Sequence, residues 1–111
     1  MEQIWSSEID LILSVGRNLE SAGVRNWALE RGDALSALQQ LSIIGVAVLG
    51  GDTYSVAGPV VQPNYDSWYC NRDRGEPNAD FVERSIAKAM DYIGKYQAPV
   101  GGVLFAIVPD A

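Results

Sequence analysis

Residues 43–56 read IIGVAVLGGDTYSV, and the architecture of the chain is clearest from this run. Its first seven residues, Ile43 to Leu49, are apolar and rich in β-branched side chains, which predicts a strand buried on both faces. The pair Gly50-Gly51 ends that strand, and Thr53 to Val56 returns to residue types that favour extended backbone. We therefore predict a second strand after the glycine pair, with a bulge or a hairpin turn between the two.

Downstream of this run the pattern predicts a third strand, a helix and a last strand. The third strand covers Tyr65 to Cys70, where alternation puts Tyr65, Ser67 and Tyr69 on one face and Asp66, Trp68 and Cys70 on the other. From Phe81 the apolar residues recur at helical spacing, so the helix should run to about Tyr96, before Pro99. Residues 103–108, which read VLFAIV, are typical of a strand in the centre of a sheet.

Upstream of the run the spacing predicts two helices. The first begins at Ser7, whose hydroxyl can cap free backbone N–H groups, and continues to Gly23. The second begins at Asp33 and ends before Gly45. Residues 26–29 are too few to assign and are left as a turn or a short strand. The predicted order is α, α, β, β, β, α, β, which indicates a single α+β domain over residues 1–111, with about three helices packed on a largely antiparallel sheet of about four strands.

The net charge of the chain limits the classes of partner that we expect. Fourteen acidic and eight basic side chains among 111 residues give a net charge of −6 at pH 7. Such a surface repels phosphate groups, so we expect neither nucleic acid nor a membrane as partner, although modest acidity also simply favours solubility. The lone Cys70 and an N-terminus without the features of a secretory signal lead us to expect a cytoplasmic protein.

Catalysis receives little support from the residue types. There is no histidine, and no phosphate-binding glycine motif, so we expect no metal and no cofactor. A small enzyme using Asp52, Asp66 or Cys70 stays as an alternative, because paired carboxylates or a thiolate can carry out hydrolysis. A structural cysteine and a carboxylate in a turn account for the same residues more simply. We therefore predict that the protein is not an enzyme.

Aromatic side chains gather between the predicted strands. Tyr54, Tyr65, Trp68 and Tyr69 lie close in sequence and are followed by Arg72. Tyrosine, tryptophan and arginine are enriched where proteins bind proteins, because each covers a large area and carries a polar tip. About half of these aromatic side chains could instead line the core face of the sheet.

Several motifs, in this order, resemble the bacterial immunity proteins of polymorphic toxin systems, and more narrowly the immunity protein 40 family. They are Trp27-Ala28-Leu29, Asp33-Ala34-Leu35, Val48-Leu49-Gly50-Gly51-Asp52-x-Tyr54, Asp66-Ser67-Trp68-Tyr69-Cys70 and the helix Phe81-x-x-x-Ser85-x-x-x-Ala89-x-x-Tyr92-Ile93. The resemblance covers nearly the whole chain, and its most specific part is the glycine motif followed by the Trp68-Tyr69 pair.

This resemblance implies an α+β cytoplasmic protein that binds a cognate toxin and protects the producing bacterium and its kin. Many such toxins are nucleases with basic clefts, so carboxylates here could imitate phosphates. We expect the toxin to meet the stretch from Asp52 to Asp80, with these candidate contacts: Asp52, Tyr54, Asp66, Trp68, Tyr69, Arg72 and Glu76. A second alternative is an accessory protein that assembles through a self-complementary apolar patch; the oligomeric state is left open.

Overall fold

The computed structural model describes residues 3–98 and 100–111. Pro99, which we expected to follow the last helix, lies outside the described residues. In chain order the elements are α1 (Ser7–Leu13), β1 (Arg17–Asn18), the 3₁₀ helix η1 (Glu20–Ala22), β2 (Trp27–Ala28), α2 (Arg31–Ile43), β3 (Val48–Ala57), β4 (Val60–Tyr69), α3 (Asn78–Lys95) and β5 (Val103–Pro109).

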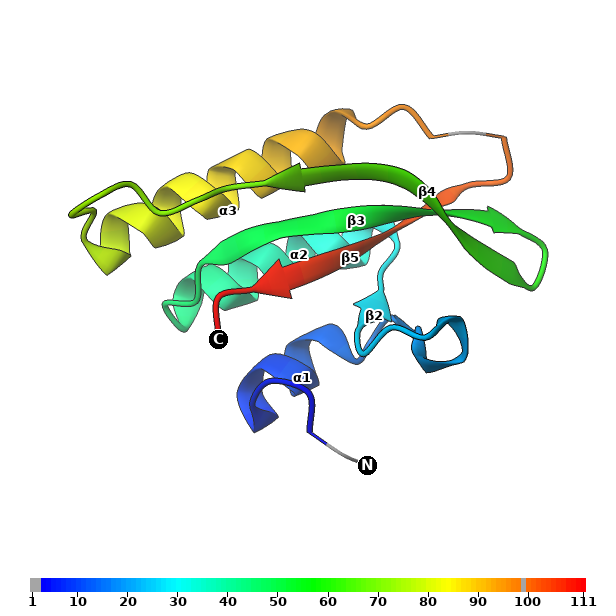
Figure 1. The fold of residues 1–111 in the computed structure, drawn as a ribbon, viewed down its shortest axis with the longest axis horizontal. Helices are drawn as coiled ribbons and strands as arrows, with labels where there is room; N and C mark the ends of the chain where they lie inside the picture. Colours follow the sequence, from blue (N-terminus) through cyan, green and yellow to red (C-terminus); the bar gives the residue numbers. More distant parts are fainter. Residues whose placement is uncertain (1–2, 99) are drawn as a thin grey trace.

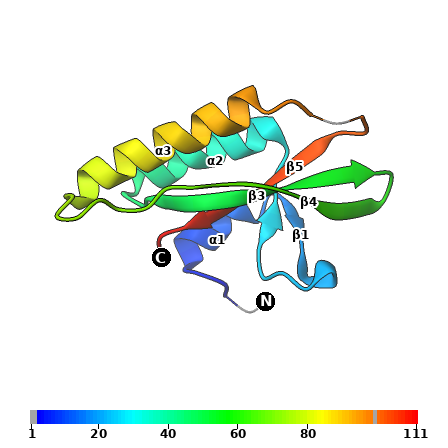
Figure 2. The ribbon, with the colours of Figure 1, turned by 45° about the horizontal axis from the view of Figure 1, so that its top comes forward.

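The larger sheet is antiparallel, with the strand order β4-β3-β5, and β1 pairs with β2 in a separate antiparallel ribbon. A single bridge between Leu29 and Phe105 ties the ribbon to β5. Helices α2 and α3 lie together on one face of the larger sheet, and the ribbon lies on the other side (Figures 1 and 2). The α+β class predicted from the sequence is confirmed.

The glycine pair is the first point at which the structure differs from the expected strand order. β3 runs through Gly50 and Gly51 without a turn, so the two predicted strands are one, and β3 rather than β5 is central. Its pairing register shifts between Val48 and Gly50 on the β5 side, which is the irregularity the glycines suggested. The hairpin turn comes later, at Gly58-Pro59, and β4 begins five residues before the predicted Tyr65.

Ile43 and Ile44 belong to the end of α2 instead of a buried strand. The Ile44 N–H donates to the Gln40 carbonyl, and Gly45 has a φ angle of +73°, a left-handed conformation that terminates helices. The Ile43 side chain is therefore 83% exposed. The β-branched Ile43 and Ile44 are therefore part of the helix end, because the glycine that terminates the helix comes after them.

The first helix is also shorter than expected, since it ends at Leu13 rather than near Gly23. Its cap is Ser6, whose hydroxyl accepts from the Ile9 N–H, and not Ser7. Gly16 lies so close to the ribbon that a Cβ there would be 2.7 Å from the Ala28 carbonyl oxygen. This contact between backbones turns the chain into β1, and a helical stripe read from the sequence does not reveal it.

Two hydrophobic cores lie on opposite faces of the sheet. The main core, between the sheet and the helices, includes Leu38, Phe81, Ile93 and Phe105. A smaller core gathers Leu19, Ala28, Tyr54, Leu104 and Ala106, where the ribbon covers part of the other face. The remainder of that face, along β3 and β4, is open. Among the described residues no helix is both long and apolar enough to cross a membrane.

Candidate functional site

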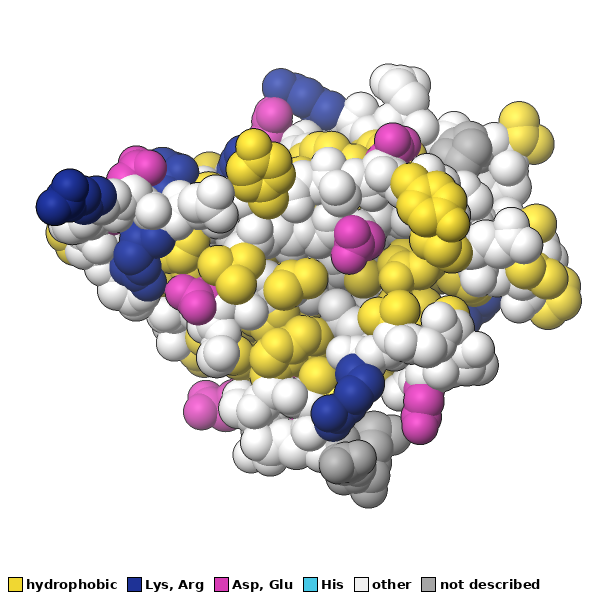
Figure 3. Space-filling view, viewed as in Figure 1, with side chains coloured by type: hydrophobic (Ala, Val, Ile, Leu, Met, Phe, Trp, Pro, Cys, Tyr) yellow, Lys and Arg dark blue, Asp and Glu magenta, His cyan; other side chains and the backbone are white. Residues whose placement is uncertain are grey.

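The open part of the sheet, which we call the open face, is formed by Leu49 and Asp52 of β3, Ser67 and Tyr69 of β4, and Val108 of β5. Leu49, Asp52, Ser67 and Val108 surround a shallow hollow of about 210 Å³, whose floor is formed by the glycine pair. Tyr69 pairs with Gly50 across the strands and is 69% exposed. Figure 3 views the molecule from this side, and hydrophobic side chains gather over the strands with isolated charged ones between them.

The glycine floor exists because Trp68 needs the space on the opposite side of the strand. A Cβ at Gly51 would lie 2.3 Å from the indole ring of Trp68, and one at Gly50 would lie 2.2 Å from the Trp68 carbonyl oxygen. The indole is buried and stacks on Tyr92 of α3, with the ring centroids 4.8 Å apart. Its Nε1 atom is buried without a hydrogen-bond partner within the described part of the chain.

Alternation separates the candidate contacts on the strands into two groups. Trp68 faces the helices, and Tyr54 lies in the smaller core, so both are buried side chains in the free protein. Burial raises the pKa of the Tyr54 hydroxyl, and the negative charge of Asp52 raises this pKa further. Asp52 is exposed and has no ion pair among residues 3–98 and 100–111.

Asp66 is exposed, but its carboxylate is hydrogen-bonded within the protein. Its Oδ2 atom accepts a hydrogen bond of 2.6 Å from the Tyr96 hydroxyl, which follows the end of α3. Tyr69 has a different neighbour on the same helix, since the Lys88 Nζ atom lies 5.1 Å from the centroid of its ring. The two residues of β4 are therefore held near the edge of the sheet by α3.

Arg72 and Glu76 lie in the loop between β4 and α3 and contact the ends of neighbouring elements. The Arg72 guanidinium stacks over Phe81, donates 2.9 Å to the Asn78 side chain and lies 3.4 Å from the Asp110 carboxylate. Glu76 accepts from Arg84 at 2.7 Å and 2.9 Å. These hydrogen bonds, one from the Asp73 N–H and the positive charge of Arg84 lower the pKa of Glu76 to about 2.

The residues of the enzymatic alternative do not share this hollow. Asp52 lines it, whereas neither Asp66 nor Cys70 does. Cys70 is buried, and its Sγ atom lies 3.3 Å from the Arg84 guanidinium. The described ranges contain no group of three or more cysteine, aspartate or glutamate residues placed to hold a metal ion.

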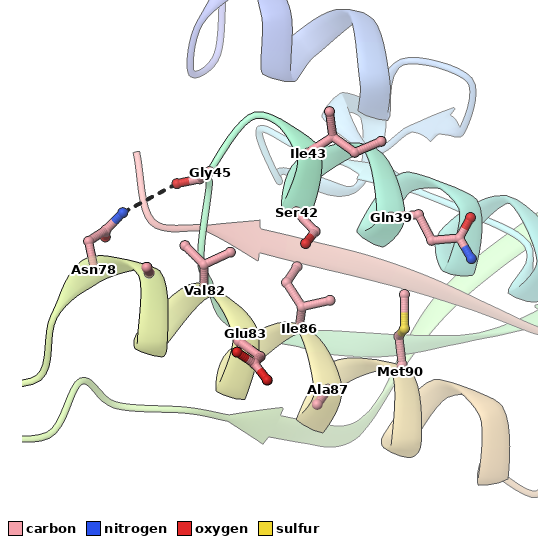
Figure 4. Close-up of a pocket in the computed structure, with 11 residues that line it drawn as sticks. Gln39, Ser42, Ile43, Gly45, Asn78, Val82, Glu83, Ile86, Ala87 and Met90 are labelled. Carbon is pink, nitrogen blue, oxygen red and sulfur yellow. Dashed lines mark hydrogen bonds between the residues drawn. The ribbon is translucent and has the colours of Figure 1, made fainter.

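Two surface features were missed by sequence reasoning. One is the unusual backbone conformation of Tyr65, a residue that the aromatic pattern already named and that is 90% exposed. The other is a groove of about 830 Å³ between α2 and α3, which is lined by Ser42 and Ile43 at the end of α2 and by Val82, Ile86 and Met90 of α3 (Figure 4). The assignment of Ile43 to a buried strand concealed the groove, although the apolar stripe of α3 was a signal for one of its walls.

A family model described as Immunity protein 40 matches residues 18–109, which include the ribbon except Arg17, the whole larger sheet and both long helices. No curated protein and no solved structure matches the chain.

Proposed function

The chain belongs to the immunity protein 40 family, and from this premise we propose that it binds a cognate bacterial toxin and neutralises it. The proposal is one of binding and not of catalysis, in the cytoplasm of the cell that produces the toxin. The observation that carries it is the family match, which covers every strand and helix around the open face.

We propose the open face as the surface that meets the toxin. It offers the exposed ring of Tyr69, which pairs with Gly50 of the shallow hollow, and Asp52, which lines the hollow and has no ion pair among the described residues. Rings of this kind carry much of the binding energy in protein interfaces, and carboxylates steer a basic partner into register. A toxin with a basic cleft, such as a nuclease, has the complementary charge.

The other candidate contacts differ in how far they are exposed, and therefore in the role that we propose for them. Asp66 lies on the edge strand, and Arg72 and Glu76 lie in the loop that follows it. Asp66 and Arg72 are exposed and can contact the toxin directly, whereas only 10% of the Glu76 side chain is exposed. Tyr54 and Trp68 are buried, so we expect them to contribute by fixing the two strands, Trp68 from the helix side of the sheet and Tyr54 from under the ribbon. A surface fixed in this way loses little entropy on binding, which favours the slow dissociation that protection requires.

Co-expression in a bacterial host tests this function. The partner is the toxic domain encoded beside this chain, and the readouts are survival and co-purification of a complex. We expect the wild-type protein to give both, and the double variant Asp52→Ala, Tyr69→Ala to lose both while it remains folded. Leu11→Ala, an exposed position on α1, is the matched control. Death of cells that contain folded wild-type protein, with no complex, overturns the proposal.

A further inference from the structure

Tyr65 has a backbone conformation that tyrosine rarely adopts. Among residues 3–98 and 100–111 it is the only non-glycine residue with a positive φ angle, at +68°. This left-handed region is crowded for any side chain with a Cβ, and glycine or asparagine normally occupies it. Tyr65 lies at a bulge of the sheet. The pairing of β3 with β4 passes from Asp52↔Ser67 to Tyr54↔Pro63, which leaves residues 64–66 opposite one residue of β3.

A hydrogen-bond network that involves three elements fixes this bulge. The Asn64 Oδ1 atom accepts from the Thr53 hydroxyl of β3 and, at 3.0 Å, from the Asp66 N–H. The Asn64 Nδ2 atom donates 2.9 Å to the Tyr96 hydroxyl, which in turn donates to Asp66. Thr53 is only 1% exposed, so the network is anchored in the interior of the protein. The residues on both sides of Tyr65 thus hold its backbone in place.

The ring of Tyr65 takes no part in this network. It is 90% exposed, and the described residues make no hydrogen bond, ion pair or ring contact with it. The fold would therefore be served as well by glycine, which adopts this φ angle without strain. Strained residues of this kind concentrate at functional sites, where the surrounding structure holds them in a conformation that serves binding.

We propose that Tyr65 is a preorganised anchor for the toxin, an inference that rests on the function proposed above. The rigid bulge presents the ring in a fixed position, so little freedom of the backbone is lost when the ring enters a pocket of the partner. The carboxylate of Asp66 follows it in the chain, and Asp52 lies on the adjacent strand. An exposed aromatic ring in the same part of the sheet as these carboxylates suits a lysine or arginine side chain, so the pocket should be rimmed by basic groups.

The test measures binding of the purified chain to the toxic domain encoded beside it, by titration calorimetry. Tyr65→Ala should raise the dissociation constant about 30-fold or more, which corresponds to about 2 kcal/mol, the value that defines a binding hot spot. Tyr65→Phe keeps the ring and should bind within about threefold of the wild type. Leu11→Ala, also strongly exposed but on α1, should bind as the wild type does.

A second variant separates an anchor from a structural role. Tyr65→Gly removes the ring and relieves the strained φ angle, so its thermal midpoint should equal or exceed that of the wild type while binding is lost. A lower midpoint for this variant, or a Tyr65→Ala protein that binds as tightly as the wild type, overturns the anchor and leaves the proposed function intact. A wild-type chain that fails to bind the domain overturns the proposed function and the anchor with it.

Discussion

Gly51 has a structural task that no other residue type can perform at that position. The Trp68 ring lies on one side of it and the Ala106 carbonyl oxygen on another, at 2.3 Å and 2.4 Å from the place where a Cβ would stand. Both contacts are shorter than any real carbon contact, and one partner is backbone. A methyl group here must push β5 or the indole away.

We therefore expect Gly51→Ala to lower the free energy of unfolding by about 1–3 kcal/mol, the usual cost of overpacking a core. Urea denaturation at neutral pH measures it. Gly94→Ala is the matched control, because a Cβ at Gly94 meets nothing within 4 Å and alanine favours a helix over glycine. The control should gain up to about 1 kcal/mol. Equal effects of the two substitutions would contradict the packing of Trp68 on the glycine floor.

Glu76 links the stability of the loop to pH. Arg84 holds its folded-state pKa at about 2, below the ordinary value of 4.5. The carboxylate therefore stabilises the folded protein at pH values above about 4.5, and this contribution is lost as the pH falls toward 2.

The substitution Glu76→Gln should accordingly lower the urea midpoint at pH 7, and the difference from the wild type should shrink as the pH approaches 2. Midpoints at pH 7, 4 and 3 measure the trend. Glu83→Gln removes a carboxylate that has no ion pair within the described ranges, and we expect a small effect at pH 7. A difference between Glu76→Gln and wild type that is independent of pH would show that the ion pair with Arg84 contributes nothing.

At the scale of elements, α3 is tied to the central strand by one buried hydroxyl. The Ser85 Oγ atom accepts 2.9 Å from the Val48 N–H and is completely buried. This hydrogen bond lies at the start of β3, where the pairing of β3 with β5 is irregular. Ser85 therefore accepts from a backbone N–H that the sheet leaves without a partner. A buried N–H without any partner costs about 1–3 kcal/mol.

Ser85→Ala should therefore destabilise the protein by about 1–3 kcal/mol in urea denaturation. Ser42→Ala, an exposed serine at the end of α2, should stay within about 0.5 kcal/mol of the wild type. Native-state hydrogen exchange adds a local readout, because the Val48 amide should lose protection in the first variant. An unchanged Val48 exchange rate would contradict the link between α3 and β3.

The elements also show why sequence predicted part of this fold. The strong helical period of α3 and the α+β class were correctly predicted because they depend on local spacing. The continuity of β3 through Gly50-Gly51 depends on Trp68, which lies seventeen positions after Gly51 in the chain. Likewise, Arg31 of α2 donates to the Tyr96 carbonyl beyond the end of α3 at 2.9 Å, a contact between distant segments that no local pattern encodes.

Part of the candidate surface also followed from local sequence patterns, and part of it did not. The alternation of residues 65–70 separated Trp68 and Cys70 from Tyr69 without indicating which face is buried, and the structure buries the first two and exposes Tyr69. Tyr54 was expected at the surface and is buried, because the ribbon that covers it comes from residues more than 25 positions earlier. The bulge at Tyr65 was missed, since its network requires Thr53 and Tyr96 to meet in space.

At the scale of the whole molecule, net charge should govern how fast the complex forms. The chain carries −6 at pH 7, and Asp52 on the open face has no ion pair within residues 3–98 and 100–111. If the toxin offers a basic cleft, long-range attraction accelerates the encounter, and salt suppresses it as the screening length falls from about 10 Å at 0.1 M to about 3 Å at 1 M.

We expect the association rate constant, measured by stopped-flow fluorescence, to fall about tenfold or more over that range of salt, while the dissociation rate constant changes little. The double variant Asp52→Asn, Asp66→Asn should show a weaker dependence on salt, because it removes two charges beside the proposed anchor. Glu83→Gln, which removes a charge from the groove on the helix side, should keep the wild-type dependence. Association that does not respond to salt would exclude a basic cleft as the partner surface, and would leave burial of the tyrosine rings as the main source of affinity.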